Sequence, residues 1–484
     1  MSYSMPLKEL LEIFSLESPE ALATVKIESI VIDSRQVTSG SLFFAYPGVH
    51  SDGRDYVLAA QEAGASAIVY EAGVELPTDV VIPAFAVTEL QAMVGYVADK
   101  FYKQPSLELQ VFGVTGTNGK TTNCYLLTQA LELLGMNAVM IGTIGVGHLS
   151  ALENSGHTTP DPISVHRLLA SFRDQGVTQV CMEVSSHALD QGRVNGVQFF
   201  CSMFTNLSHD HLDYHHDMAQ YAAAKRRLFT AFHSELVITN ANDDMGAGLI
   251  DVANAEFIVS YGRGGDVYAD EVDLTDSGMR LYIEGNGIDF ELSTPLIGRI
   301  NVANIEMLVA TLLALSTSIE EIQTILAQLK PAPGRMELFT APNKPQVVVD
   351  YAHTPDALEK ALLSVKAHCD GQLWCVFGCG GDRDKEKRSL MGRAASEYAD
   401  KIVVTNDNPR SELPELIAQE IVAGVANDVQ IELDRKQAIL SSINSASSND
   451  WVLIAGKGHE TTQQIGERIS PFSDRELVAQ LVTE

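Results

Sequence analysis

Short apolar runs alternate with amphipathic helical stretches along most of the chain, a pattern typical of α/β proteins. Near the start, SIVID (29–33) and ASAIVY (65–70) flank the helical stretch DYVLAAQEAG (55–64). Later runs such as LELQVFGVTG (107–116) and PQVVVDYA (345–352) read as buried strands, each followed by a helical stretch. The pattern therefore predicts mostly parallel sheets covered by helices.

Two polar segments interrupt this pattern and predict domain boundaries. Residues 103–105 (KQP) precede one buried strand, and PAPGR (331–335) precedes another. We expect a small α/β domain over 1–104, a central P-loop-like domain over 105–334 and a Rossmann-like domain over 335–484. Residues 257–292 read as a β-rich insert in which GNG (285–287) forms a tight turn.

Charge, cysteine content and the lengths of the apolar runs disfavour several classes of protein. The 484 residues carry 33 basic and 63 acidic side chains, a net charge of −30, which disfavours nucleic acid and anionic membrane surfaces as partners. The six cysteines form no CxxC pair, so we expect reduced, mostly buried thiols. With no signal-like N-terminus and no apolar run of membrane-spanning length, we expect a cytoplasmic protein without membrane insertion.

The segment GVTGTNGKTT (113–122) lies between a predicted strand and a predicted helix, where a phosphate-binding loop belongs. The general P-loop pattern is not met, because Val114 stands where a glycine is required. Even so, glycines, a lysine and hydroxyls at this junction favour ATP binding over a plain turn. The candidate residues are Gly116, Thr117, Asn118, Gly119, Lys120, Thr121 and Thr122.

Several other segments remain ambiguous from the residues alone. SHDHLDYHH (208–216) fits either a metal site or a polar loop with capping aspartates. Lys225, before two arginines, reads as a solvated helix face. Arg335 reads equally as a linker charge, and PGVHSDGR (47–54) and DNPR (407–410) each fit a turn.

Taken together, the motifs resemble the Mur ligase family, which joins an amine to a carboxylate at the expense of ATP. In family order the chain contains TGTNGKTT (115–122), EVSSHAL (183–189), TNLSHDHLDYH (205–215), AAAKRRLF (222–229), GRINVANI (298–305), PGRME (333–337), DYAHTPDAL (350–358), GCGGDRDKEKR (378–388), DNPR and AGKGHE (455–460). The last three are not explained by the folylpolyglutamate synthetase relatives. They are similar to the branch that adds the third residue to a UDP-muramoyl dipeptide.

This resemblance implies a monomeric ligase of peptidoglycan precursor synthesis that uses ATP and Mg²⁺. Its substrates would be UDP-N-acetylmuramoyl-L-alanyl-D-glutamate and meso-2,6-diaminopimelate, joined through an acyl phosphate. Two alternatives stay open: a ligase that adds lysine instead, and a non-catalytic nucleotide-binding switch.

The resemblance also implies roles for individual residues. It makes Lys120, Glu183, His211 and Lys225 catalytic, with Thr121, Glu183, His211 and a carbamylated Lys225 (N6-carboxylysine) as metal ligands. It places Asn301, Arg335 and Asp350 around ATP. The UDP-muramoyl dipeptide would contact Ser34, His50, Ser51, Thr158, Thr159, Ser185, Gln191 and Arg193, and His157 stands where the family often has asparagine.

Diaminopimelate ends in an ammonium and a carboxylate, so its recognition needs both a guanidinium fork and an acidic acceptor. The resemblance places this pocket in the last domain. We expect Arg383 and Arg410 to bind the carboxylate and Glu460 to bind the ammonium. The full set is Arg383, Asp407, Asn408, Pro409, Arg410, Gly456 and Glu460.

Overall fold

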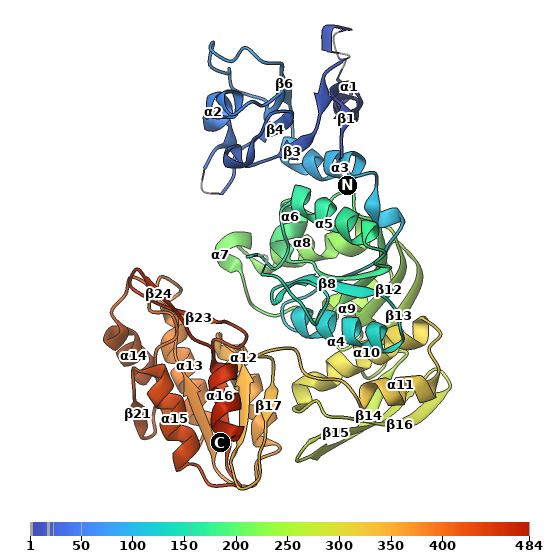
Figure 1. Cartoon of the computed structure of the whole chain (residues 1–484). Coiled ribbons are helices and arrows are strands. Elements are labelled where there is room, and N and C mark those ends of the chain that lie inside the picture. The colour runs from blue at the N-terminus through green and yellow to red at the C-terminus, as the bar shows by residue number, and fades with distance from the viewer. Residues whose placement is uncertain (1–2, 17–19, 23, 50, 155, 484) are drawn as a thin grey trace. The chain divides into compact units, whose positions relative to one another are not determined.

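The computed structural model describes residues 3–16, 20–22, 24–49, 51–154 and 156–483. Its internal contacts divide the chain into two compact units, Met1–Ser260 and Tyr261–Glu484 (Figure 1). Each unit is described by itself.

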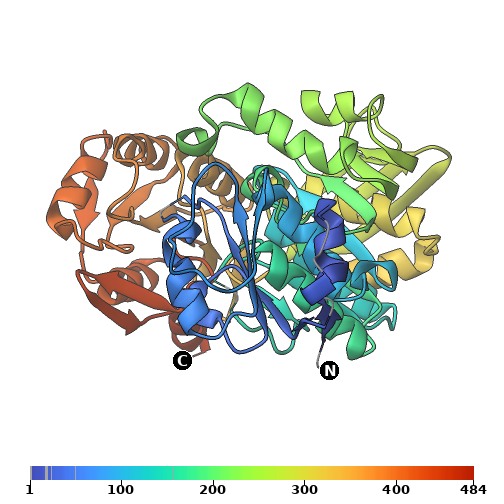
Figure 2. The same ribbon diagram turned by 90° about the horizontal axis from the view of Figure 1, so that it is seen from above.

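The first unit begins with a small four-stranded parallel sheet, ordered β3 (Ser29–Val31), β4 (Ser41–Ala45), β5 (Ala67–Glu71), β6 (Ala84–Val87). Successive residues of β4 point to opposite faces: Phe43 packs with helix α2 (Val57–Glu62), whereas Phe44 packs with α1 (Leu7–Leu11) and α3 (Leu90–Phe101). Figure 2 looks down on these strands, drawn in blue with α2 beside them. The predicted α/β layering of this region is present.

A seven-stranded sheet forms the rest of this unit, with β7 at its centre. Its order is β13 (Ala255–Tyr261), β12 (Ser234–Asn240), β11 (Phe199–Phe204), β7 (Gln110–Thr115), β10 (Gln179–Glu183), β8 (Ala138–Gly142), β9 (Gly145–Gly147). The pairs from β12 to β8 are parallel, and β9 is antiparallel to β8. The carboxyl ends of β7, β10 and β11 therefore open at one edge, where a ligand site is expected.

The helices of this part are α4 (Lys120–Leu133), α5 (Pro162–Asp174), α6 (Ser186–Asp190), α7 (Leu212–His215), α8 (Met218–Thr230) and α9 (Asp244–Leu249). Side chains from α5, α8 and α9 pack against buried side chains of the sheet in one apolar core. This core fixes the edge from which the loops emerge.

The second unit begins with an antiparallel sheet of β14 (Tyr268–Thr275), β15 (Gly278–Gly285) and β16 (Ile288–Thr294). Asn286 and Gly287 join β15 to β16 with φ of 33° and 84°, as a two-residue hairpin turn with two positive φ angles requires. The expected GNG turn is confirmed. Helices α10 (Val302–Ala314) and α11 (Ile319–Leu326) follow.

A six-stranded sheet completes this unit, in the order β17 (Glu337–Phe339), β18 (Gln346–Asp350), β22 (Trp451–Ala455), β19 (Leu373–Phe377), β20 (Lys401–Val404), β21 (Val429–Ile431). All pairs are parallel except β17 with β18. One face packs on α12 (Pro355–Lys366), α13 (Glu386–Tyr398) and α14 (Pro414–Val422), the other on α15 (Arg435–Ser445) and α16 (Asp474–Thr483). The strand predicted over 345–352 is present as β18, and the expected mostly parallel sheet is confirmed, with the short strands β17 and β21 at its edges.

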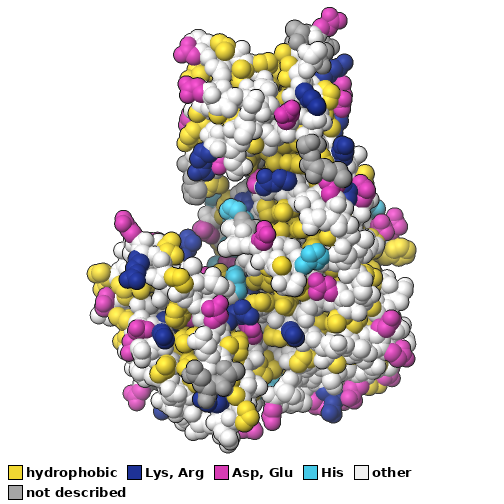
Figure 3. Space-filling view, in the orientation of Figure 1, with side chains coloured by type: hydrophobic (Ala, Val, Ile, Leu, Met, Phe, Trp, Pro, Cys, Tyr) yellow, Lys and Arg dark blue, Asp and Glu magenta, His cyan; other side chains and the backbone are white. Residues whose placement is uncertain are grey.

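On the face shown in Figure 3, lysine and arginine side chains lie singly among acidic ones. Within the described part of the chain, every helix is too short or too polar to cross a membrane. All six cysteines are free thiols, and five of them are buried.

Candidate functional site

The predicted phosphate loop connects the central strand β7 to helix α4. Gly116 and Gly119 have φ of 149° and 86°, angles that side-chain-bearing residues rarely adopt. A Cβ atom at Gly116 would lie 1.8 Å from the Thr205 hydroxyl oxygen. Both space and backbone conformation therefore require glycine at position 116.

The segment that follows β11 holds this loop in place. The backbone N–H of Thr117 donates to the carbonyl of Asn206 at 2.8 Å, and that of Asn118 donates to the Asn206 side chain at 3.0 Å. The Thr205 hydroxyl donates to the carbonyl of Asn118 at 2.6 Å. The loop is thus braced across two neighbouring strands before any ligand binds, which is the preorganisation that phosphate binding favours.

Hydroxyl and carboxylate oxygens meet at the start of α4. The buried Thr121 hydroxyl donates to Glu183 Oε2 at 2.9 Å. Thr143 donates to the same carboxylate through its backbone N–H (2.7 Å) and its hydroxyl (3.2 Å), and lies 3.0 Å from the Thr158 hydroxyl. This cluster offers hard oxygen donors of the kind that Mg²⁺ prefers. Thr122, next along α4, is half-buried.

Lys225 is buried, with 1% of its surface exposed, so the solvated helix face suggested by its flanking arginines is wrong. Its Nζ donates to the Gly116 carbonyl at 2.7 Å and lies 4.5 Å from the centre of the Tyr221 ring. Burial, with the nearby Lys120 charge adding to it, holds the pKa of Lys225 well below its usual value. The side chain therefore lies against the phosphate loop as a readily deprotonated amine.

Three histidines gather beside Lys225. The ring of His211 lies 4.9 Å from that of His187 and 6.1 Å from that of Tyr221, and the His215 ring lies 5.2 Å from Tyr221. Burial, reinforced by His211, lowers the pKa of His187 to about 4. Burial also lowers the pKa values of His211 and His215, so all three rings favour the neutral form. Among the described residues, no three His, Cys, Asp or Glu side chains form a metal-binding group.

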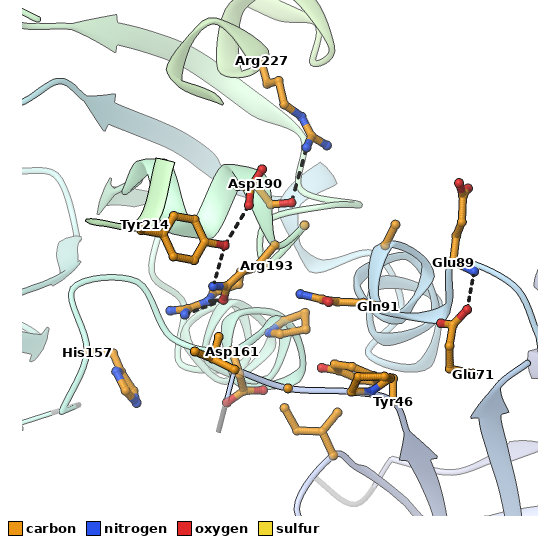
Figure 4. A pocket seen from close by; sticks show the side chains of 18 residues that line it. Tyr46, Glu71, Glu89, Gln91, His157, Asp161, Asp190, Arg193, Tyr214 and Arg227 are labelled. Carbon is orange, nitrogen blue, oxygen red and sulfur yellow. Dashed lines mark hydrogen bonds between the residues drawn. The ribbon is translucent and has the colours of Figure 1, made fainter. Parts of the chain in front are cut away.

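A cavity of about 860 Å³ lies within the first unit, between the small sheet and the central sheet. Figure 4 shows Arg193, Tyr214 and Asp190 directed toward one another on one side, with Gln91 and Tyr46 on another. Its volume fits a ligand larger than most small metabolites. Two of the residues expected to contact the sugar and peptide, Gln191 and Arg193, line it together with His157.

A hydrogen-bond chain orients the polar wall of this cavity. Arg193 donates twice to Gln191 Oε1 (2.9 and 2.6 Å), Gln191 donates to the Tyr214 hydroxyl at 3.0 Å, and Tyr214 donates to Asp190 at 2.7 Å. Arg193 also donates to the Thr159 carbonyl at 2.9 Å. Thr159 in turn donates to the backbone carbonyl of Glu183 at 2.8 Å. The cavity wall and the oxygen cluster thus belong to one network.

The remaining candidates of the first unit have simpler surroundings. Ser185 caps α6 by accepting from the N–H of Ala188. Ser34 starts a short 3₁₀ helix and Ser51 is exposed in a turn, and neither is among the residues found to line the cavity. His50 lies outside the described residues.

In the second unit, the residues expected around ATP lie at the start of α10 and beside β18. Asn301 is buried and donates to the Ile297 carbonyl at 2.8 Å. The Arg335 guanidinium lies 4.3 Å from the centre of the Tyr351 ring. Burial raises the pKa of Asp350, whose carboxylate accepts from the N–H groups of Met336 and Ala352.

The residues expected to bind diaminopimelate come together in the second unit at the carboxyl edge of the six-stranded sheet. The Arg410 guanidinium donates to the Gly381 carbonyl at 2.7 Å, and Asn408 donates to Glu460 at 2.9 Å. Arg383 is exposed on the same loop as Gly381, and Pro409 is buried. This edge therefore carries the guanidinium groups of Arg383 and Arg410 and the carboxyl groups of Asp407 and Glu460.

A buried lysine that the sequence did not predict as a site residue, Lys457, contacts two of these pocket residues. Lys457 donates to Glu460 Oε2 at 2.8 Å and to Asn408 Oδ1 at 3.2 Å. Burial opposes ionisation of Glu460, but Lys457 and Asn408 outweigh it and hold the pKa of Glu460 below its usual value. Close by, burial raises the pKa of Asp407.

Comparison with known proteins shows the family. The chain matches the Mur ligase family catalytic domain over residues 26–102, the Mur ligase middle domain over 114–314 and the Mur ligase glutamate ligase domain over 334–458. It is 42% identical over 480 residues, 97% of this chain and 98% of the relative, to the UDP-N-acetylmuramoyl-L-alanyl-D-glutamate--2,6-diaminopimelate ligase of Coxiella burnetii. The chain belongs to the Mur ligase family.

Solved structures agree. A UDP-N-acetylmuramoyl-L-alanyl-D-glutamate--2,6-diaminopimelate ligase matches with a TM-score of 0.73 and 32% identity, covering 100% of this chain and 99% of that one. The MurF ligase of Thermotoga maritima, solved in complex with ADP, shares the fold at 17% identity and a TM-score of 0.63, covering 94% of this chain and 96% of that one.

Proposed function

We propose that this chain is an ATP-dependent ligase that joins meso-diaminopimelate to the D-glutamate of UDP-N-acetylmuramoyl-L-alanyl-D-glutamate. The identity to relatives of that activity along the whole chain supports the substrates. The observation that carries the chemistry is the meeting of the phosphate loop, the Thr121–Glu183 pair and buried Lys225 at one edge of the central sheet.

Amide formation needs a leaving group on the acyl carbon. A carboxylate oxygen of the substrate attacks the γ-phosphorus of ATP, the bond to the β-phosphate oxygen breaks, and ADP leaves. The amine nitrogen of diaminopimelate then attacks the acyl carbon of the resulting acyl phosphate, inorganic phosphate departs and the amine loses a proton. Because negative charge spreads over the transferring oxygens, the site needs cations rather than a protein nucleophile.

The chain supplies one of these cations through Lys120, whose Nζ lies 2.8 Å from two carbonyl oxygens of the loop. The hydroxyl of Thr121 and the carboxylate of Glu183 suit Mg²⁺, which when bound would neutralise charge on the phosphate oxygens. We assign His211 to the same region, since its ring flanks Tyr221 beside Lys225.

Lys225 is proposed to carry a carbamate. Its neutral amine attacks the carbon of CO₂, an N–C bond forms, one C=O electron pair moves to oxygen and a proton leaves the nitrogen. Burial favours this step because only the unprotonated amine is nucleophilic. The product is a carboxylate, which supports the assignment of Lys225 as a metal ligand.

Substrate exchange tests the proposal. Phosphate release should require both the UDP-muramoyl dipeptide and meso-diaminopimelate, and lysine should replace diaminopimelate poorly because it lacks the distal carboxylate. Replacing Arg410 with alanine should raise the KM for diaminopimelate about 100-fold, the effect of removing one partner of a buried charge pair, with little change for ATP. Equal turnover with lysine would indicate a lysine-adding ligase, and ATP binding without any amide product would indicate a nucleotide switch.

A further inference from the structure

Arg435, at the start of α15, is completely buried together with Asp474, the first residue of α16. The guanidinium donates to both carboxylate oxygens of Asp474, at 2.8 and 2.7 Å. Its other N–H groups donate to two backbone carbonyls, that of Asn406 at 3.1 Å and that of Ala455 at 2.9 Å. No element of the proposed chemistry uses this pair.

The two carbonyls lie at the ends of strands that are not neighbours. Ala455 ends β22 and Asn406 follows β20, and β19 lies between these strands in the sheet. The next residue in each case is Asp407 or Gly456, both assigned above to the amino-acid pocket. A single planar guanidinium thus spans the bases of the two pocket loops, residues 406–410 and 456–460.

The two pocket loops also approach each other closely. A Cβ atom at Gly456 would lie 2.6 Å from the carboxylate of Asp407. Farther along, Asn408 and Glu460 are joined at 2.9 Å, and Lys457 bonds to both. A small change in the spacing of the strand ends would therefore be transmitted to Glu460 and Arg410.

We propose that Arg435 is a positioning residue for amino-acid selection. Its guanidinium group fixes the spacing of the two pocket loops, and the two hydrogen bonds to Asp474 fix the orientation of that guanidinium. This inference rests on the proposed function, because it assigns these loops to diaminopimelate. Buried ion pairs are often no more stabilising than apolar side chains of similar size. A role in positioning explains the pair better than a role in stability.

The test replaces the pair with apolar residues, in the double variant Arg435→Met and Asp474→Leu. Because both charges are removed together, no buried charge is left unpaired and this variant should fold. Its melting temperature should fall by about 5 °C, because the carbonyls of Asn406 and Ala455 lose their donor. Its KM for diaminopimelate should rise about tenfold, the result of misplacing polar contacts, while the KM values for ATP and the UDP-muramoyl dipeptide stay within twofold.

Lys366→Met is the matched control. Lys366 pairs with Asp400 at 2.5 Å, and the same Asp400 oxygen accepts from the N–H of Leu373 at the opposite end of β19. This variant also removes an ion pair of the same sheet, and its KM for diaminopimelate should not change. An equal rise in the control would make the effect structural and overturn the proposal.

A second measurement does not depend on catalysis. Amide hydrogen exchange at residues 407, 408 and 410 and at 456–460 should become about tenfold faster in the double variant, because the bonds that anchor the two loops are lost. Exchange in β19 should be unaffected. If the unaltered protein makes no amide with diaminopimelate, the proposed function is wrong. The exchange measurement still tests whether Arg435 anchors the two pocket loops. A folded double variant with unchanged exchange in both loops overturns the inference.

Discussion

Lys120 and Lys225 donate to the same oxygen, the carbonyl of Gly116, at 2.8 and 2.7 Å. Two ammonium groups that share one acceptor repel each other, and the more deeply buried one is the easier to deprotonate. Lys120 opens a helix at the edge of the loop, whereas Lys225 is buried and lies over Tyr221. Burial and the Lys120 charge together hold the pKa of Lys225 well below its usual value, so Lys225 releases its proton more readily than an ordinary lysine.

The first prediction concerns carbamylation. Replacing Lys120 with methionine removes the neighbouring charge that depresses the pKa of Lys225, so a larger fraction of that amine is protonated and less reacts with CO₂. Carbon-13 NMR with labelled bicarbonate should detect a carbamate signal in the unaltered protein at pH 8 and a weaker one in the variant. A signal of equal size in both would contradict the shared-acceptor account, and Lys225→Met serves as the blank.

The second prediction concerns the loop glycine. Gly116→Ala places a methyl group where the Thr205 hydroxyl lies, so the loop must move by more than 1 Å. Displacements of this size cost about 100-fold in rate. We expect at least that loss in kcat/KM, with the chain still folded. Gly135→Ala, at a helix end with no atom within 4 Å of the added Cβ, is the control for positive φ. Comparable activity of Gly116→Ala and the unaltered enzyme would refute the geometry.

A buried acid and a buried histidine face each other between α3 and α5. His166 Nε2 lies 2.9 Å from the Asn195 carbonyl and must donate to it, so Nδ1 carries a lone pair toward Asp99 Oδ1 at 3.5 Å. Burial lowers the pKa of His166 to about 4, and burial, partly offset by Gln104, raises that of Asp99 to about 6. Asp99 must therefore be protonated for the two atoms to bond.

The third prediction follows from the raised pKa of Asp99. A carboxyl whose folded pKa is raised stabilises the protein below its unfolded pKa and loses that stability as pH rises through the folded value. Asp99→Asn keeps a donor for His166 at every pH, so it should gain about 2 kcal/mol over the unaltered protein between pH 4.5 and pH 8. Urea unfolding at the two pH values measures the gain. A stability difference that does not change with pH would show that Asp99 does not titrate in this range.

The fourth prediction concerns Lys457, which keeps Glu460 ionised. In Lys457→Met the attraction of Lys457 is lost, and only Asn408 and His459 still oppose the effect of burial on that carboxyl. Its pKa therefore rises, and it loses its charge as the pH falls. The KM for diaminopimelate should then increase between pH 8 and pH 5.5 in the variant and stay nearly flat in the unaltered enzyme. Parallel pH profiles of the two proteins would exclude Glu460 as the acceptor of the ammonium.

The sequence predicted the layers and the phosphate loop because both depend on local order: apolar strands, glycines and a helix start. Short edge strands such as β21 carry too few residues for a pattern. The burial of Lys225 was not predictable from its neighbours, since Arg226 and Arg227 indicate an exposed face.

Contacts between distant segments were also beyond the sequence. Tyr46, Gln91 and Tyr214 line the cavity from three parts of the chain. No motif or hydrophobic pattern in the sequence around these residues indicates that they lie close together. Likewise, Arg435 and Asp474 are charged residues in polar surroundings, and only packing of α15 on α16 buries them.

The most direct test of the account follows one oxygen atom. With the D-glutamate carboxylate of the UDP-muramoyl dipeptide labelled with ¹⁸O, turnover with ATP and meso-diaminopimelate should place one labelled oxygen in the released inorganic phosphate. Phosphate that carries no label, formed at the same rate as the amide, would contradict activation of the acid as an acyl phosphate.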